Sequence, residues 1–143
     1  PAPDVAGTKL DGDTAYIIDP AENAALCRST GVEPAGDGTA HPSYYYIATQ
    51  VAMGQTVAGL CALCDFDVEQ GPMMASSSVR YLAPLRTARP YRVTGEITGL
   101  TRKSSRKLGL MDLLEYRLRL HEADGAIVLE TTNVWVLPRR ELM

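Results

Sequence analysis

The 143-residue sequence predicts an α+β domain in which one long apolar helix is wrapped by a curved antiparallel β-sheet. Three observations favour this fold class. The region 42–64 is apolar or small on every face, as in a helix that is buried all round. From Gly71 onward the sequence changes to extended segments rich in Val, Leu, Tyr and Thr. One of these segments alternates between apolar and polar residues, which indicates a sheet with one packed face.

The length and composition indicate a single domain, residues 1–143, with its core over about residues 15–138. A hydrophobic content of 45% is enough to fill one core. The net charge of -3 argues against nucleic-acid binding, which needs positive charge for the phosphates. The first residues contain no basic segment followed by an apolar run, so no signal or transit peptide is visible, and no segment is long enough to span a membrane. We therefore expect a cytoplasmic protein.

The three cysteines predict neither a disulfide framework nor a metal site. They are odd in number and lie in apolar surroundings, which is typical of a reducing compartment. Cys61 and Cys64 have C-x-x-C spacing, but no second pair and no suitably spaced His completes a set of metal ligands. We expect both to be core residues one helical turn apart. With no glycine-rich dinucleotide motif either, no cofactor is expected.

Two helices are predicted in the first half of the chain. Asp19 as N-cap and Pro20 at the first helical position begin a short helix, which ends near Gly31. Residues 32–40 are a loop by composition. The long helix over residues 42–64 then begins with a proline in its first turn.

Strands are predicted in the second half, over residues 74–81, 89–102, 108–121 and 126–138. The dipeptide Asp124-Gly125 predicts a hairpin between the last two. The charged run 101–107 is expected to form a solvated turn.

The third of these strands gives the clearest pattern. One face carries Leu110, Asp112, Leu114, Tyr116, Leu118 and Leu120. The other face is polar and charged and includes His121, which we expect to be exposed. Only the helix over residues 42–64 is long and apolar enough to cover the packed face.

The order of the elements, and several of their sequences, resemble the MaoC-like dehydratase and hydratase branch of the hot-dog superfamily. The similar segments are 41–44, which opens the central helix, the turn 71–72, and 79–86 leading into 91–97. The resemblance implies a single hot-dog domain that forms a homodimer, or a heterodimer with a related hot-dog subunit. It also implies an acyl-CoA or acyl-carrier thioester as ligand, bound in a tunnel between two subunits.

Active members of this family carry a Gly-Asp-x-Asn-Pro-aliphatic-His motif on a loop before the central helix, and the nearest sequence here is residues 36–41. Thr39 replaces the Asn, Ala40 replaces the Pro, and His41 comes one position early. The resemblance implies that Asp37 and His41 share the acid and base work of adding water to a 2-enoyl thioester. Alternatively, Asp37 belongs to a turn and His41 opens the helix, as in a non-catalytic partner subunit.

Five further residues are candidates for binding the ligand. Tyr44 and Tyr45 belong to a run of three tyrosines that point around the helix, so they either face a pocket or pack in the core. Ser77 points to the opposite face from its neighbours and either lines the tunnel or simply begins a strand. Arg80 and Arg86 either bind CoA phosphates through their guanidinium groups or are solvated surface residues.

The leading functional hypothesis is a hydro-lyase of fatty acid metabolism that acts on 2-enoyl or 3-hydroxyacyl thioesters. Such an enzyme, an enoyl-CoA hydratase or 3-hydroxyacyl dehydratase, would be complete as a homodimer or would need a second, related subunit. The first alternative is a non-catalytic subunit that binds acyl-CoA. The second is an acyl-CoA thioesterase, whose usual signature is not found in this sequence.

Overall fold

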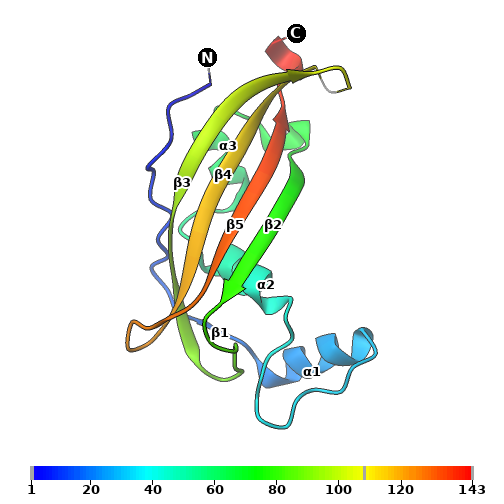
Figure 1. Cartoon of the computed structure of the whole chain (residues 1–143), viewed down its shortest axis with the longest axis vertical. Helices are drawn as coiled ribbons and strands as arrows, with labels where there is room; N and C mark the ends of the chain where they lie inside the picture. Colours follow the sequence, from blue (N-terminus) through cyan, green and yellow to red (C-terminus); the bar gives the residue numbers. More distant parts are fainter. Residues whose placement is uncertain (1, 108, 143) are drawn as a thin grey trace.

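The computed structural model, which describes residues 2–107 and 109–142, contains a curved five-stranded antiparallel sheet with helices packed against one face (Figure 1). The strand order is β1-β3-β4-β5-β2. The strands are β1 (Tyr16–Ile17), β2 (Met73–Tyr81), β3 (Pro90–Ser105), β4 (Gly109–Glu122) and β5 (Ile127–Pro138). The helices are α1 (Pro20–Ser29), α2 (Tyr44–Ala52) and α3 (Val57–Leu63), with 3-10 turns η1 (Val68–Gln70) and η2 (Arg140–Leu142). Figure 1 shows α2 and α3 behind the sheet and α1 beyond one end of it.

The alternation predicted for the third long strand is confirmed in β4. Every second residue from Asp112 to Leu120 is buried, and the residues between them are half-buried. Tyr116 on β4 lies opposite Ile97 on β3 and Asn133 on β5, so all three share the face that α2 covers. We call this the inner face of the sheet.

The strand boundaries agree with the sequence prediction except near the β3–β4 turn. β2 and β5 each begin within one residue of the predicted start. β3 continues to Ser105, so most of the charged run 101–107 lies in a strand and not in a solvated turn. The reason is that Arg102 binds Asp112 across the ladder, at 2.8 Å between Nε and Oδ1. Leu108, the predicted start of the next strand, lies outside the described residues, and β4 begins at Gly109.

His121 was expected to be exposed and is instead half-buried. Its Nε2 lies 2.7 Å from the hydroxyl of Thr94, and its Nδ1 lies 3.1 Å from the carbonyl oxygen of Gly125. The turn of the β4–β5 hairpin folds back against the ring, which the alternation pattern does not reveal.

The expected single helix over residues 42–64 is divided into α2 and α3, which are bent by 64° at their junction. The cause is the N-terminal part of the chain. The N–H of Gly54 donates to the carbonyl oxygen of Leu10 at 2.9 Å, and a Cβ at Gly54 would lie 2.3 Å from the carbonyl oxygen of Asp11. Thr56 then caps α3 by accepting a backbone hydrogen bond of 3.0 Å from its first turn.

We expected a helix that is buried on every side, and this prediction is wrong. The helices α2 and α3 cover the sheet with one face only. Val51 on α2 is 65% exposed. Within the described ranges, no single helix is long and apolar enough to cross a membrane. Taken together, the bent pair α2 and α3 has the required length and apolar character.

The cysteines are core residues, as predicted. Cys27, Cys61 and Cys64 are all buried and form no disulfide. Burial raises the pKa of Cys61 and raises that of Cys64 to about 11. Both thiols are therefore protonated at neutral pH and are poor nucleophiles and metal ligands.

The segment of residues 5–12 pairs with β3, an interaction that the sequence did not predict. The N–H of Gly7 donates to the carbonyl oxygen of Ile97 at 2.7 Å, and the N–H of Leu10 donates to that of Gly95 at 2.8 Å. The Leu10 side chain is fully buried in the core. We call this segment the N-terminal arm.

Helix α1 forms as predicted. Oδ2 of Asp19 accepts a hydrogen bond of 2.9 Å from the N–H of Glu22, and Pro20 occupies the first helical position. Gly31 follows the helix with a φ of 81°, a left-handed conformation that glycine adopts without a steric penalty.

A buried ion pair lies where β4, the end of β5 and α3 meet. Arg139 and Asp112 are 2% and 0% exposed, and Nε of Arg139 is 2.8 Å from Oδ2 of Asp112. Arg139 also donates to the carbonyl oxygens of Cys64 and Asp65, which ties the end of α3 to the sheet. Burial alone would raise the pKa of Asp112, but hydrogen bonds and positive charge from Arg102 and Arg139 outweigh it and hold this pKa below its ordinary value.

Substitution of Gly54 tests the origin of the helix break. We expect Gly54→Ala to lower the free energy of unfolding by about 1–3 kcal/mol, because the new Cβ would collide with the carbonyl oxygen of Asp11. Gly36→Ala is the matched control, because no atom lies within 4 Å of a Cβ at that position. Urea unfolding measures both, and equal stability of the two variants would contradict this account.

Removal of the charge on Asp112 tests the buried ion pair. Asp112→Asn leaves the buried Arg139 with only the partly exposed carboxylate of Glu141 as counter-charge and is expected to cost about 3–5 kcal/mol of stability. The control is Glu130→Gln at a partly exposed ion pair with Arg119, expected to cost about 0.2–1 kcal/mol. Urea unfolding of both variants gives the comparison, and similar losses would show that burial does not set the strength of the Asp112 pair.

Acidification tests the same group in the intact protein. Because its pKa is lower in the folded than in the unfolded chain, Asp112 contributes its full stabilisation above its ordinary pKa of 3.8. That contribution is lost as the pH falls from 3.8 through the lower folded value. We expect the unfolding free energy of the wild type to fall more steeply over this range than that of Asp112→Asn. Parallel pH profiles would be inconsistent with a lowered pKa.

Candidate functional site

An apolar groove of about 450 Å³ lies between the loop that precedes α2 and the segment that follows β2. It is lined by Thr39, Ala40 and Pro42 on one side and by Tyr81, Leu82, Ala83, Pro84 and Leu85 on the other. The N–H of Ala40 donates to the carbonyl oxygen of Leu85 at 2.7 Å, so hydrogen bonds between backbones hold the two sides together. We call this cavity the β2 groove.

Asp37 lies on the loop that forms one side of the β2 groove. Its Oδ1 accepts a hydrogen bond of 2.9 Å from the N–H of Thr39, which closes a turn, and the residue is exposed. That hydrogen bond lowers the pKa of Asp37, so the carboxylate is ionised at neutral pH. In the part of the chain that the structure describes, no hydrogen bond or ion pair joins the side chains of Asp37 and His41.

His41 is held between α1 and α2. Its Nδ1 accepts a hydrogen bond of 3.1 Å from the N–H of Ser43, so the ring proton is on Nε2, which lies 3.3 Å from the hydroxyl of Thr30. Its backbone N–H donates to Oδ1 of the buried Asn23 at 2.7 Å. The one ring nitrogen with a free lone pair thus already accepts a hydrogen bond.

Two of the proposed ligand-binding residues meet at the interface between helix and sheet. The hydroxyl of Tyr45 on α2 lies 2.8 Å from Oγ of Ser77 on β2, and that Oγ donates to Oδ1 of Asn133 at 2.6 Å. Tyr45 and Ser77 are half-buried. Tyr44 is only 3% exposed and belongs to the core, on the side of α2 that faces Tyr16, so it does not join this cluster.

Two residues were missed in the sequence analysis: Asn133, which belongs to this cluster, and Tyr81, which lies near Tyr45. The hydroxyl of Tyr81 donates to the carbonyl oxygen of Pro42 at 3.0 Å, beside the β2 groove. Asn133 is fully buried on the inner face, opposite Ser77 in the ladder. The available signal was alternation, because an inward-facing Asn among packed residues needs polar partners.

Arg80 and Arg86 lie apart. Alternation along β2 sends Ser77 and Tyr81 to the inner face and Arg80 to the outer face, where it lies opposite Glu130 in the ladder. Arg86 instead braces the loop beside the groove, since its Nη1 donates to the carbonyl oxygen of Asp37 at 2.8 Å. The two guanidinium groups therefore do not converge on one phosphate position.

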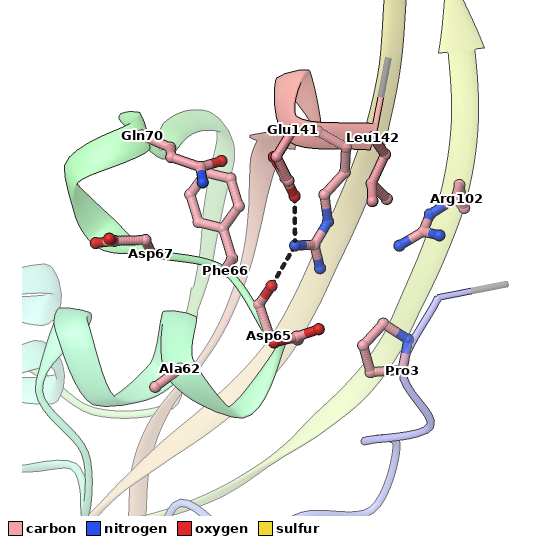
Figure 2. A pocket seen from close by; sticks show the side chains of 10 residues that line it. Pro3, Ala62, Asp65, Phe66, Asp67, Gln70, Arg102, Glu141 and Leu142 are labelled. Carbon is pink, nitrogen blue, oxygen red and sulfur yellow. Dashed lines mark hydrogen bonds and ion pairs between the residues drawn. The ribbon is translucent and has the colours of Figure 1, made fainter.

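A larger hollow of about 610 Å³ lies at the other end of the sheet, where β5 ends (Figure 2). Asp65, Arg102 and Glu141 surround it. Its cations serve the fold, because Arg102 and Arg139 bind Asp112, and Arg139 also pairs with Glu141 at 3.2 Å. Over residues 2–107 and 109–142, no three His, Cys, Asp or Glu side chains are grouped so that they could hold a metal ion. The β2 groove is therefore the candidate site.

No family model matches the sequence, and no curated protein matches it. The fold does match solved structures. The HadBC (3R-hydroxyacyl-ACP dehydratase) complex of Mycobacterium tuberculosis has a TM-score of 0.72 at 12% identity, over 93% of this chain and 97% of that one. The MaoC-like dehydratase of Rhodospirillum rubrum has a TM-score of 0.64 at 15% identity, over 94% and 93%.

The ChsH1-ChsH2 complex of Mycobacterium tuberculosis is also similar, with a TM-score of 0.60 at 13% identity over 92% of this chain and 83% of that one. Thioesterase structures match as well. These identities are too low to carry a function across, but the curved antiparallel sheet and its covering helices are common to all of them. The chain therefore has the hot-dog fold that MaoC-like dehydratases and hot-dog thioesterases share.

Proposed function

We propose that the chain is the acyl-thioester-binding subunit of a heteromeric hydro-lyase that interconverts 2-enoyl and 3-hydroxyacyl thioesters. The observation that carries the proposal is the apolar β2 groove, together with the engagement of the neighbouring Asp37 and His41 in local turns. The groove provides binding, and a partner subunit of the same fold provides the acid–base pair.

The lining of the groove suits an acyl chain. Leu82, Ala83, Pro84 and Leu85 offer apolar surface on one side, and Ala40 and Pro42 face them on the other. Removal of an alkyl chain from water into such a groove is favourable by roughly 0.8 kcal/mol for each buried methylene. Such a lining offers little to a highly charged ligand.

The polar groups beside the groove are not arranged for hydration. Addition of water to an enoyl thioester needs a base for the water and an acid for the α-carbon, held together at the reacting atoms. Here Nδ1 of His41 already accepts a hydrogen bond from Ser43, and the Asp37 carboxylate caps its own turn. Two of the similar structures, HadBC and ChsH1-ChsH2, are complexes of two components, which supports a division of labour between subunits.

The second candidate is a hydratase that is active without a partner and uses Asp37 and His41 as its acid–base pair. It is favoured by the position of both residues on the loop that lines the groove. Ligand binding would then have to release His41 from Ser43.

The deciding experiment mixes the purified chain with a short and a long trans-2-enoyl-CoA. We expect saturable binding by calorimetry, no loss of enoyl-thioester absorbance and no release of CoA thiol. Leu82→Glu should weaken binding at least about 10-fold, because it places a charge in the apolar groove. Ile127→Glu is the matched control, since Ile127 is an exposed apolar residue outside the groove lining.

The other outcomes decide between the alternatives. Rapid loss of absorbance would establish the self-sufficient hydratase, and Asp37→Asn and His41→Ala should then each abolish turnover. Release of CoA thiol would identify a thioesterase. Absence of binding, or equal binding by the Leu82→Glu variant, would overturn the proposed groove function.

A further inference from the structure

Two tyrosines belong to this region: Tyr81 lines the β2 groove, and Tyr45 lies on the first turn of α2, where its N–H donates to the carbonyl oxygen of the groove residue Pro42 at 3.2 Å. The hydroxyl hydrogens of both are already used within the protein. The simpler case is Tyr81, which lines the groove. Its hydroxyl lies 3.0 Å from the carbonyl oxygen of Pro42. A carbonyl oxygen can only accept, so Tyr81 donates its hydrogen and presents only lone pairs elsewhere.

The direction of the hydrogen bonds at Tyr45 is set by a chain of two bonds. Oγ of Ser77 donates to Oδ1 of Asn133 at 2.6 Å, which uses the only hydrogen of that hydroxyl. Ser77 must therefore accept from its other neighbour, the hydroxyl of Tyr45 at 2.8 Å. The oxygen of Tyr45 is left as an acceptor.

Asn133 fixes this direction from within the core. It is fully buried between β2 and β4, opposite Ser77 on one side and Tyr116 on the other. The hydroxyl of Tyr116 is itself engaged, because it donates to Gln50 at 3.1 Å and accepts from Trp135 at 3.0 Å. Among the described residues Nδ2 of Asn133 is buried without a hydrogen-bond partner, so Asn133 acts on the hydroxyl groups of Ser77 and Tyr45 through Oδ1 as a positioning residue.

The acceptor oxygen that lines the groove is neutral. Burial raises the pKa of Tyr81, and the nearby Tyr45 raises it further, so the phenol stays protonated at neutral pH. A neutral acceptor beside apolar walls favours a neutral hydrogen-bond donor on the ligand over a cation.

We propose that Tyr45 and Tyr81 form an acceptor pair that binds a hydrogen-bond donor of the ligand, a hydroxyl or an amide N–H, beside the apolar groove. This inference rests on the proposed function. A 3-hydroxyacyl thioester carries such a hydroxyl, and the pantetheine arm carries amide N–H groups. A saturated or 2-enoyl chain carries no donor, so the pair would discriminate between the hydrated and the dehydrated ligand if the hydroxyl is the group bound.

The test compares a 3-hydroxyacyl-CoA with the saturated acyl-CoA of the same chain length. Calorimetry gives the dissociation constants for wild type, Tyr45→Phe and Tyr81→Phe, with Tyr46→Phe as the matched tyrosine control. Loss of one neutral hydrogen bond is expected to weaken binding about 3- to 10-fold. Weakening confined to the 3-hydroxyacyl ligand identifies the hydroxyl as the donor, and equal weakening of both ligands identifies a pantetheine N–H.

A second variant tests the direction of the chain. Ser77→Ala removes the acceptor for the Tyr45 hydrogen, so the Tyr45 hydroxyl becomes free to donate to a ligand. We expect the affinity for a 3-oxoacyl-CoA to rise relative to the 3-hydroxyacyl-CoA by about 3-fold or more. A merely structural role of Ser77 would leave this ratio unchanged.

The inference is overturned if both Phe variants bind both ligands as the wild type does, or if Ser77→Ala leaves the 3-oxo to 3-hydroxy ratio unchanged. In either case, binding of acyl-CoA by the wild type would still support the proposed function. If the wild type binds neither ligand, the proposed function fails first, and this inference fails with it.

Discussion

Burial of one face of the sheet is the constraint on which the rest of the structure depends. The alternation along β4 leaves a single apolar face, and α2 and α3 are the elements that remove it from water. This helical cover is held at two points. The N-terminal arm packs against the junction of α2 and α3 at Gly54, and Arg139 binds the end of α3. Tyr45 on the cover and Ser77 on the sheet meet because both elements are fixed in this way.

The parts of the fold that depend on local sequence could be predicted. The strands follow from alternation and turn residues, and α1 follows from its N-cap at Asp19. The break between α2 and α3 could not be predicted, because it depends on carbonyl groups of the N-terminal arm that are distant in sequence. The extension of β3 was missed for a similar reason: Arg102 looks like a solvated residue until its partner Asp112 is placed beside it.

The candidate site was only partly predictable. The resemblance to MaoC-like proteins pointed to the loop that carries Asp37 and His41, and this loop does form one wall of the β2 groove. The sequence could not reveal that backbone N–H groups of the same loop and of the start of α2 occupy both side chains. The contact between Tyr45 and Ser77 depends on how a helix lies on a strand, which a one-dimensional pattern leaves open. Asn133 could have been found from the sequence, because alternation along the last strand places this polar residue on the packed face.

The two edges of the sheet are protected differently. The first half of β3 is paired with β1 and the N-terminal arm, and the remainder carries Arg102 and Lys103, which discourage a further strand. In the described part of the chain, β2 pairs with β5 alone, and Arg80 is its one charged residue. The edge of β2 is therefore less protected than the edge of β3. If two copies joined through β2, each would turn its protected β3 edge outward, and this edge would disfavour the addition of a third chain and growth into a fibre.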